Sequence, residues 1–367
     1  MPSDALTVLH VDTERGWRGG ERQVYWLATE MLAHRHRPLV AARAGEPLAE
    51  RLTKAGVEVV PVDPFTELDP FAAARLRRVI RRERVTIVHA HTAHAVALAA
   101  LSSIGAKSKM VVTRRVDFPL RSNAGTRWKY GQADGIIAIS NAVADIMARG
   151  GISRARIEIV PSGVDPDRQV EPASADVLQA IGLPRGVPWV VQVGALVQHK
   201  DPLNFVRAVA AARRTLPALH GVLVGEGSLR QAVEREIREQ RLEDVLHLTG
   251  YRKDADALLT AATVAALSSE EEGLGTVLLD AMSFGVPIAA TLAGGIPEIV
   301  EHDISGLLAP THNPDALGAA IARLAQDRDL AMRIVAGGKR RVVEFSATRT
   351  MEKTVEVYRR VLGGDAS

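Results

Sequence analysis

The chain has 367 residues, of which 47% are hydrophobic and 24% are charged, a composition typical of globular domains that bury sizeable cores. This length predicts about two domains, and no apolar run approaches the ~20 residues that a membrane-spanning helix needs. The absence of cysteine excludes disulfides, thiolate nucleophiles and cysteine-ligated metal sites. Residues 1–10 lack the basic and long apolar segments of a secretory signal, so we expect a soluble cytoplasmic protein.

The charge is unevenly distributed. Residues 1–185 carry a net charge of +6 and residues 186–367 carry −3, which gives the total of +3. Within the first half, residues 71–129 hold 13 Lys and Arg but only 2 Asp and Glu. Such a basic field attracts phosphates, nucleic acids or anionic lipids. Because aromatic residues make up only 4%, platforms for base stacking are scarce, and we expect no nucleic-acid partner.

Short apolar runs alternate with longer amphipathic segments from the N-terminus. We predict strands at 6–11, 38–41, 57–60, 86–89, 110–113 and 135–139, with helices at 21–34, 46–55, 69–82 and 93–103. Prolines cluster at 161–188 and interrupt the pattern. The alternation then resumes, with strands at 189–193, 221–224, 245–248, 264–267 and 287–290, and helices at 202–214, 228–241, 276–284, 314–327, 330–343 and 350–362. This order predicts two α/β domains with doubly wound parallel sheets, which bind ligands at the carboxyl ends of their strands.

The strongest local pattern is the segment 268–282, which follows a predicted strand. Gly273 and Gly275 permit a tight turn and a close backbone approach to a ligand. The helix beginning near Thr276 offers free N–H groups and a positive dipole end, which suit phosphate. Glu272 and Asp280 supply carboxylates that accept hydrogen bonds from sugar or ribose hydroxyls. By itself, the pattern is equally typical of an ordinary helix start with solvated acids.

The spacing from Glu272 to Asp280 resembles the signature of retaining nucleotide-sugar glycosyltransferases of family GT4, in which two acids flank seven residues. Asp280 stands where that family has a second Glu. The resemblance runs from about residue 6 to Tyr358. Its other motifs are Gly19-Gly20, Pro161-Ser162-Gly163-Val164-Asp165, Val224-Gly225-Glu226-Gly227, His247-Leu248-Thr249-Gly250-Tyr251, Gly294-Gly295-Ile296-Pro297-Glu298 and Ser305-Gly306-Leu307-Leu308.

The resemblance implies a GT-B fold, with two Rossmann-like doubly wound parallel-sheet domains facing a cleft. The first, residues 1–168, is expected to bind the acceptor, and a helix at about 346–363 is expected to pack back on it. The second, residues 185–345, is expected to bind the nucleotide sugar.

The resemblance also assigns roles to individual residues. Glu272 is expected to contact the donor sugar and Asp280 the ribose. Lys200 and the helix start at Gly275-Thr276 are expected to stabilise the departing nucleoside diphosphate. The other expected donor contacts are Gly194, Gly225, Tyr251, Arg252, Ser269 and Gly273, and those of the first domain are the Gly19-Gly20 loop, His91 and Arg115.

Several of these residues also have ordinary structural interpretations. Gly19-Gly20 suits a plain strand–helix turn, and Arg114-Arg115 suits a surface basic pair. The histidines at 89, 91 and 94 suggest a metal site, but no nearby acid or cysteine completes a ligand set, and we expect no metal. Asp165-Pro166-Asp167 resembles a metal-binding acid pair but lies in the interdomain link, where it fits turn chemistry.

The chain departs from the family at Ala195, where GT4 enzymes usually have a phosphate-binding Arg after the glycine. Three alternatives remain. In the first, Lys200 alone binds the diphosphate. In the second, another cation such as Arg115 replaces the missing Arg, and in the third, activity is reduced.

We therefore expect a glycosyltransferase that moves a sugar from a nucleotide-diphosphate donor to an acceptor hydroxyl with retention, without a metal or other cofactor. The basic stretch suggests a glycan, lipid-linked or lipopolysaccharide-type acceptor. Residues 75–84 form a basic amphipathic helix that suits peripheral association with an anionic membrane, or else an arginine-rich solvated helix. The alternatives are a non-catalytic sugar-nucleotide binder, supported by Ala195 and Arg115, and a nucleotide-sugar epimerase of related fold.

Overall fold

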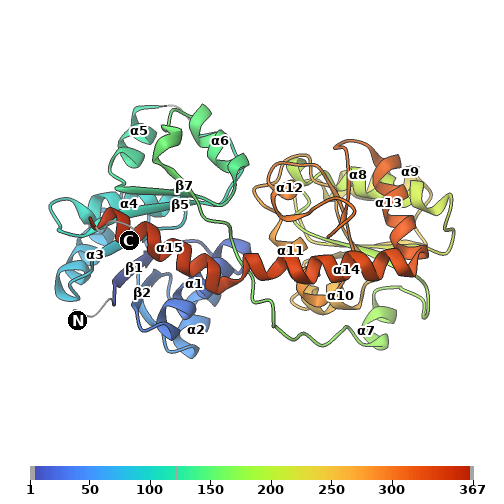
Figure 1. Ribbon diagram of the computed structural model, residues 1–367, viewed down its shortest axis with the longest axis horizontal. Coiled ribbons are helices and arrows are strands. Elements are labelled where there is room, and N and C mark those ends of the chain that lie inside the picture. Colours follow the sequence, from blue (N-terminus) through green and yellow to red (C-terminus); the bar gives the residue numbers. More distant parts are fainter. Residues whose placement is uncertain (1–4, 121–122, 364–367) are drawn as a thin grey trace. The chain divides into compact units, whose positions relative to one another are not determined.

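Short apolar strands form two separate parallel sheets in the computed structural model, which describes residues 5–120 and 123–363 (Figure 1). The chain divides into two units. The first runs up to Gly163 and resumes at Ala347, and the second comprises Val164–Ser346. Residues 164–168, predicted to lie in the first domain, belong with the second unit, where the Val164 amide donates to the Phe345 carbonyl at 2.9 Å.

In the described part of the first unit, seven parallel strands are ordered β3-β2-β1-β4-β5-β6-β7. Their apolar side chains are buried because helices cover both faces of the sheet. The strands are β1 (Thr7–Val11), β2 (Arg37–Ala42), β3 (Glu58–Pro61), β4 (Ile87–Ala90), β5 (Lys109–Arg114), β6 (Gly135–Ala138) and β7 (Ile157–Ile159). The order reverses between β1 and β4, which in doubly wound sheets is the place where ligands bind.

Local sequence signals define the helices of this unit. Asp69 caps α3 by accepting hydrogen bonds from two backbone amides, and Pro70 follows at the first helical position, where proline is favoured. The last helix, α15, packs against α1 and β6. The helices are α1 (Gly19–Ala33), α2 (Pro47–Lys54), α3 (Pro70–Arg82), α4 (Ala93–Ser103), α5 (Ala124–Gly131), α6 (Asn141–Arg149) and α15 (Ala347–Val361).

The second unit has, among its described residues, six parallel strands ordered β10-β9-β8-β11-β12-β13. They are β8 (Trp189–Val193), β9 (His220–Val224), β10 (Leu246–Gly250), β11 (Val264–Leu267), β12 (Ile288–Thr291) and β13 (Leu307–Ala309). The helices are α7 (Ala175–Ala180), α8 (Pro202–Arg213), α9 (Arg230–Glu239), α10 (Ala255–Ala261), α11 (Thr276–Phe284), α12 (Ile296–Ile299), α13 (Pro314–Gln326) and α14 (Arg328–Val342). A 3₁₀ turn, Gln198–Lys200, follows β8.

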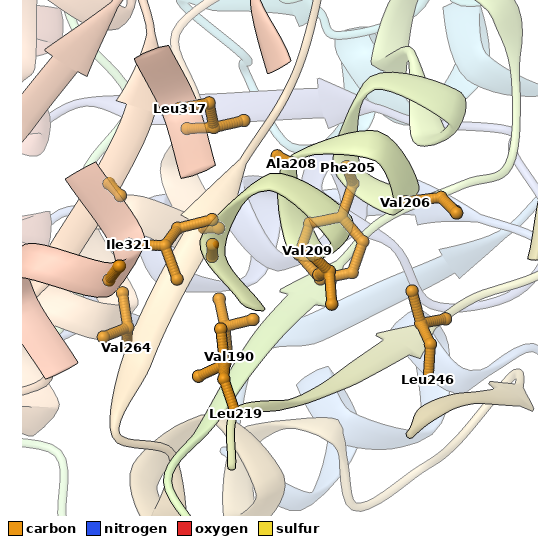
Figure 2. Close-up of a cluster of buried hydrophobic side chains, with 14 of the residues drawn as sticks. Val190, Phe205, Val206, Ala208, Val209, Leu219, Leu246, Val264, Leu317 and Ile321 are labelled. Carbon is orange, nitrogen blue, oxygen red and sulfur yellow. The ribbon is translucent and has the colours of Figure 1, made fainter. Parts of the chain in front are cut away.

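The core of the second unit lies between its sheet and helices α8 and α13. Phe205 and Val209 of α8 point toward the strands that carry Val190 and Val264, and Ile321 of α13 lies beside them (Figure 2). All five side chains are fully buried. This packing fixes the strands, so the loops at their carboxyl ends project from a rigid base.

Candidate functional site

Three glycines end the neighbouring strands β8, β9 and β10, at Gly194, Gly225 and Gly250. Gly225 has a φ of +154°, and a Cβ added there would lie 1.8 Å from the Gly194 carbonyl oxygen. Its amide donates to the Gly250 carbonyl at 2.9 Å. Only glycine fits at Gly225, and the three glycines leave the backbone at the carboxyl ends of β8, β9 and β10 open to the close approach of a ligand.

Lys200 and Glu272 meet at the same edge of the sheet. The Lys200 ammonium donates to the carboxylate of Glu272, which is buried, and the Ser269 hydroxyl donates to Glu272 Oε2 at 3.2 Å. The two loops that carry them are tied together, because the Glu270 and Glu271 amides both donate to the His199 carbonyl, at 2.9 and 3.1 Å. Three of the predicted residues thus form one hydrogen-bonded group.

The two glycine motifs of this unit pack backbone against backbone. A Cβ added to Gly294 would lie 2.1 Å from the Glu272 carbonyl oxygen, and one added to Gly295 would lie 2.3 Å from that of Gly273. The Gly295 amide donates to the Glu272 carbonyl at 2.8 Å. The loop after β12 therefore holds the loop that carries Glu272 in place.

Helix α11 begins directly after this loop. Its N-cap is Gly275, which has a φ of +84° and offers no side chain to cap the first amides of the helix. The first turn, which starts at Thr276, therefore presents N–H groups and the positive end of the helix dipole. This arrangement suits an anionic group beside Lys200.

Asp280 is buried one helical turn further along α11, and its partner is Arg168, which no sequence motif indicates. Arg168 donates from Nη2 to Asp280 Oδ1 at 3.0 Å and from Nη1 to Asp256 Oδ2 of α10 at 2.8 Å. Arg168 lies just after the Pro161–Asp165 motif, but 112 positions before Asp280. No local pattern connects the two residues.

Tyr251 and Arg252 follow β10, and among the described residues neither forms a hydrogen bond or ion pair with Lys200. The Tyr251 side chain is 64% exposed. Arg252 pairs with Asp254 through two hydrogen bonds of 2.8 and 2.6 Å. Ala195 is exposed just after Gly194, and adds no charge to this edge.

A second polar cluster lies in the first unit, where Asp12, His91 and Arg115 each directly follow one of the neighbouring strands β1, β4 and β5. Arg115 Nη1 lies 2.9 Å from His91 Nδ1, and His91 Nε2 lies 2.9 Å from His10 Nδ1. Because a guanidinium can only donate, His91 Nδ1 must accept, and His91 then donates from Nε2 to His10. The remaining hydrogen of His10 is on Nε2, which is buried and has no partner among the described residues.

The histidines at 89, 91 and 94, for which no metal is expected, do not come together, because His94 lies exposed on α4. His10 takes its place, and the nitrogens of His10, His89 and His91 lie within 4.8 Å of one another. Both nitrogens of His89 already have partners, the Tyr358 hydroxyl at 2.5 Å and the Thr113 hydroxyl at 2.7 Å. With Arg115 beside His91, the trio fits a hydrogen-bonded core network better than a cation site.

Burial controls the protonation of this cluster. It lowers the pKa of His10 to about 3 and those of His89 and His91 well below the usual value, and the Arg115 charge lowers all three further. Burial also lowers the pKa of Arg115 to about 10, so Arg115 stays cationic at neutral pH. The cluster at pH 7 is therefore three neutral imidazoles beside one guanidinium.

Two buried acids face this guanidinium and were not singled out from the sequence. Burial raises the pKa of Asp12 to about 7, and Asp12 Oδ2 has no partner among the described residues. Burial also raises the pKa of Glu21, which accepts from the Arg18 amide at 2.7 Å at the start of α1.

The pair Gly19-Gly20, predicted to form a loop, instead forms the first residues of helix α1. Arg114, which precedes Arg115 in the chain, is buried and donates to the Phe118 carbonyl.

Comparisons with protein families cover both units. Residues 17–168 match the family model described as Glycosyltransferase Family 4, and residues 176–341 match the model described as Glycosyl transferases group 1. Both halves of the chain thus match models of the same group of enzymes.

Several curated proteins resemble this chain along most of its length. It is 29% identical over 298 residues to the D-inositol 3-phosphate glycosyltransferase of Salinispora arenicola, a match that covers 76% of this chain and 65% of the relative. In the Salinispora tropica protein of the same name, the match covers 60% of the relative. It is also 29% identical over 322 residues to the alpha-maltose-1-phosphate synthase of Mycolicibacterium smegmatis, covering 79% of this chain and 82% of the relative.

Solved structures share the fold. HepE from Anabaena, crystallised with UDP and glucose, superposes with a TM-score of 0.83 at 20% identity, over 97% of this chain and 100% of that one. A glycosyltransferase from Rickettsia africae gives a TM-score of 0.82 at 20% identity, over 98% and 100%. The predicted fold class, two parallel α/β sheets of the GT-B type, is confirmed.

Proposed function

Because the chain belongs to glycosyltransferase family 4, we propose that it transfers a sugar from a nucleoside-diphosphate donor to an acceptor hydroxyl, with retention of configuration. One observation carries this proposal beyond family membership. Lys200, Glu272, Ser269 and the uncapped start of α11 lie together at the carboxyl edge of the second sheet. That edge supplies positive charge for a diphosphate and a carboxylate for sugar hydroxyls.

In the proposed reaction, the bond between the anomeric carbon and the diphosphate oxygen breaks, and its electron pair stays on the departing nucleoside diphosphate. Lys200 and the N-terminus of α11 stabilise the negative charge that develops there. The acceptor oxygen attacks from the face that the diphosphate leaves, and its proton passes to the departing phosphate. Glu272 accepts hydrogen bonds from the sugar. Since these groups supply the positive charge, we propose that the reaction needs no metal.

We propose that the first unit binds the acceptor at the cluster of His91 and Arg115. Arg115 is a cation beside His91, held within a cluster of polar side chains, which suits a phosphate or carboxylate on the acceptor or donor. The acceptor class that fits the basic first unit is a glycan, lipid-linked or lipopolysaccharide-type precursor.

We further propose that helix α3 brings the protein to anionic membrane surfaces. Phe71, Arg75, Arg78 and Arg82 are exposed along one stripe of the helix, and Phe65 in the preceding loop is 96% exposed. Arginines attract anionic headgroups, and exposed aromatic rings insert at the interface. In the described part of the chain, no helix is long and apolar enough to span a bilayer.

Sedimentation with vesicles tests the membrane proposal. Binding to phosphatidylglycerol vesicles should fall steeply with salt and be lost in Arg75→Glu/Arg78→Glu. The matched reversal Arg214→Glu/Arg323→Glu, in the second unit, should bind like the wild type. Equal binding to neutral phosphatidylcholine vesicles, or binding that survives the α3 reversal, would contradict it.

The enzymatic proposal is tested by the melting midpoint with UDP, GDP, ADP and TDP and their glucose or mannose esters, followed by donor hydrolysis and transfer assays. A ligand that binds only the folded state raises the midpoint by mass action. We expect one nucleotide to do so, with the shift lost in Lys200→Gln and kept in Lys353→Ala, an exposed lysine of α15. No shift with any nucleotide rules the proposal out. Binding without hydrolysis or transfer indicates the non-catalytic alternative, and epimerised donor indicates the epimerase.

A further inference from the structure

Arg168 makes an unusual set of contacts for a residue of a connecting segment. Its guanidinium bridges two carboxylates, Asp280 at 3.0 Å and Asp256 at 2.8 Å, and its carbon Cζ lies 4.9 Å from the ring centroid of Phe284. Asp280 and Phe284 are four residues apart on α11, so they lie on one face of that helix. The guanidinium therefore lies across one face of α11 and reaches α10.

The segment that carries Arg168 is itself shaped by hydrogen bonds. The Asp167 amide donates to Asp165 Oδ1 at 3.0 Å, and the Arg168 amide donates to the Asp165 carbonyl at 3.3 Å. These contacts form a turn that fixes where the Arg168 side chain begins. The side chain is then held at its far end by two carboxylates and an aromatic ring.

The consequence for Asp280 is a fixed orientation. Its side chain is only 6% exposed, and burying a carboxylate without a partner is costly. Arg168 supplies the opposite charge and occupies Oδ1 from a defined direction. A carboxylate has about four acceptor positions, so this contact orients the group without exhausting its capacity to accept hydrogen bonds.

We propose that Arg168 is a positioning residue that aims the Asp280 carboxylate at the ribose hydroxyls of the donor nucleotide. This inference rests on the proposed function, in which Asp280 contacts the ribose. Arg168 acts through Asp280, and Asp256 completes the bridge. The loss of Arg168 should therefore reduce the preference for ribonucleotides over deoxynucleotides, and should not weaken the binding of both equally.

The test is a comparison of substrates and variants. Binding of UDP, GDP and ADP, and of their 2′-deoxy and 3′-deoxy counterparts, is measured by calorimetry for wild type, Arg168→Ala, Arg168→Lys, Asp280→Asn and Asp256→Asn. A hydrogen bond to a charged group predicts a preference for ribose of about tenfold or more in the wild type. We expect Asp280→Asn and Arg168→Ala to bring that ratio close to one, with Arg168→Lys and Asp256→Asn intermediate.

The control is Arg214→Ala, which removes another arginine of the second unit, one that pairs with Asp315 on the surface. It should keep the wild-type ratio. If Asp280→Asn abolishes the preference but Arg168→Ala and Arg168→Lys weaken ribo- and deoxynucleotides equally, Arg168 is only structural and the inference fails. If Asp280→Asn leaves the ratio unchanged, the ribose role of Asp280 in the proposed function fails, and the inference fails with it. Melting curves without ligand identify any variant that does not fold. If Arg168→Ala does not fold, the preference for ribose measured in Arg168→Lys decides between the positioning role and a purely structural one.

Discussion

Ala195 is exposed just after β8, at the edge of the sheet that carries Lys200 and the start of α11. We predict that Ala195→Arg tightens the binding of nucleoside diphosphates by about tenfold, because a second cation there adds charge-assisted hydrogen bonds to phosphate. The gain should shrink at high salt, since exposed charges are screened. Calorimetry at low and high salt measures both effects.

The matched control for this prediction is Ala195→Gln, which has a similar length without the charge and should leave affinity unchanged. Equal affinities for wild type and Ala195→Arg at low salt would contradict the prediction, and would indicate that diphosphates do not bind at this edge.

Individual residues differ in how far the sequence could predict their neighbours. The loop with Ser269 and Glu272 was predictable because its motif is local, and Lys200 because it follows a strand that ends in the same sheet. The Tyr358–His89 contact spans 269 positions, and the His10–His91 contact spans 81. Such pairs depend on how helices and strands pack, which no local pattern records.

At the scale of elements, the predicted strands and helices were accurate where an apolar run had a clear cap or a proline beside it. The strand at 189–193 and the helices at 93–103 and 276–284 have the predicted bounds. Some of the elements that were not predicted are very short, such as β7 and β13 with three residues each. Others lie in segments where the hydrophobic pattern is weak. Helix α7 lies inside the proline-rich break, where Ser174 caps it.

The close packing of the two glycine motifs leads to a prediction about Gly294. Its φ of +48° is strained for other residues, and a Cβ would lie 2.1 Å from the Glu272 carbonyl oxygen. We predict that Gly294→Ala destabilises the second unit by more than about 2 kcal/mol and weakens nucleotide binding, because the Glu272 loop must move. Urea titration and calorimetry measure the two losses.

Gly131→Ala is the control, because a Cβ at Gly131 meets nothing within 4 Å. This variant should be neutral or slightly stabilising, since alanine is the better helix former. A Gly294→Ala protein with wild-type stability and affinity would show that the loop yields to the added methyl group, contrary to the prediction.

At the scale of the whole molecule, the charge asymmetry and the division into two α/β units were predictable, because both depend on sums over many residues. The buried polar cluster of the first unit was not, and it determines how stability depends on pH. Below about pH 6.5 the imidazoles of an unfolded chain take up protons, whereas burial keeps His10, His89 and His91 neutral in the folded state. These groups therefore stabilise the fold less as the pH falls.

The buried acids act in the opposite direction. The pKa of Asp12 is raised to about 7, so the folded state holds a proton that the unfolded state has lost between about pH 4 and pH 7. Glu21 contributes in the same sense. Three imidazoles outweigh two carboxyls, and each net proton is worth about 1.4 kcal/mol per pH unit. Unfolded imidazoles are about 90% protonated on average between pH 6 and pH 5. The net difference is therefore about one proton, and we predict that the free energy of unfolding of the first unit falls by about 1–2 kcal/mol as the pH falls from 6 to 5.

Two variants with opposite signs make this prediction specific. His10→Leu removes one of the three imidazoles and should flatten the slope by about 1.4 kcal/mol per unit, whereas Asp12→Asn should steepen it by about the same amount. Urea titrations followed by tryptophan fluorescence measure the slope in a Trp189→Phe background. The other three tryptophans, at 17, 26 and 128, all lie in the first unit, so the signal reports on that unit alone. Stability that is flat from pH 5 to 7, or two variants that shift the slope in the same direction, would show that water reaches these imidazoles and that burial does not set their charge.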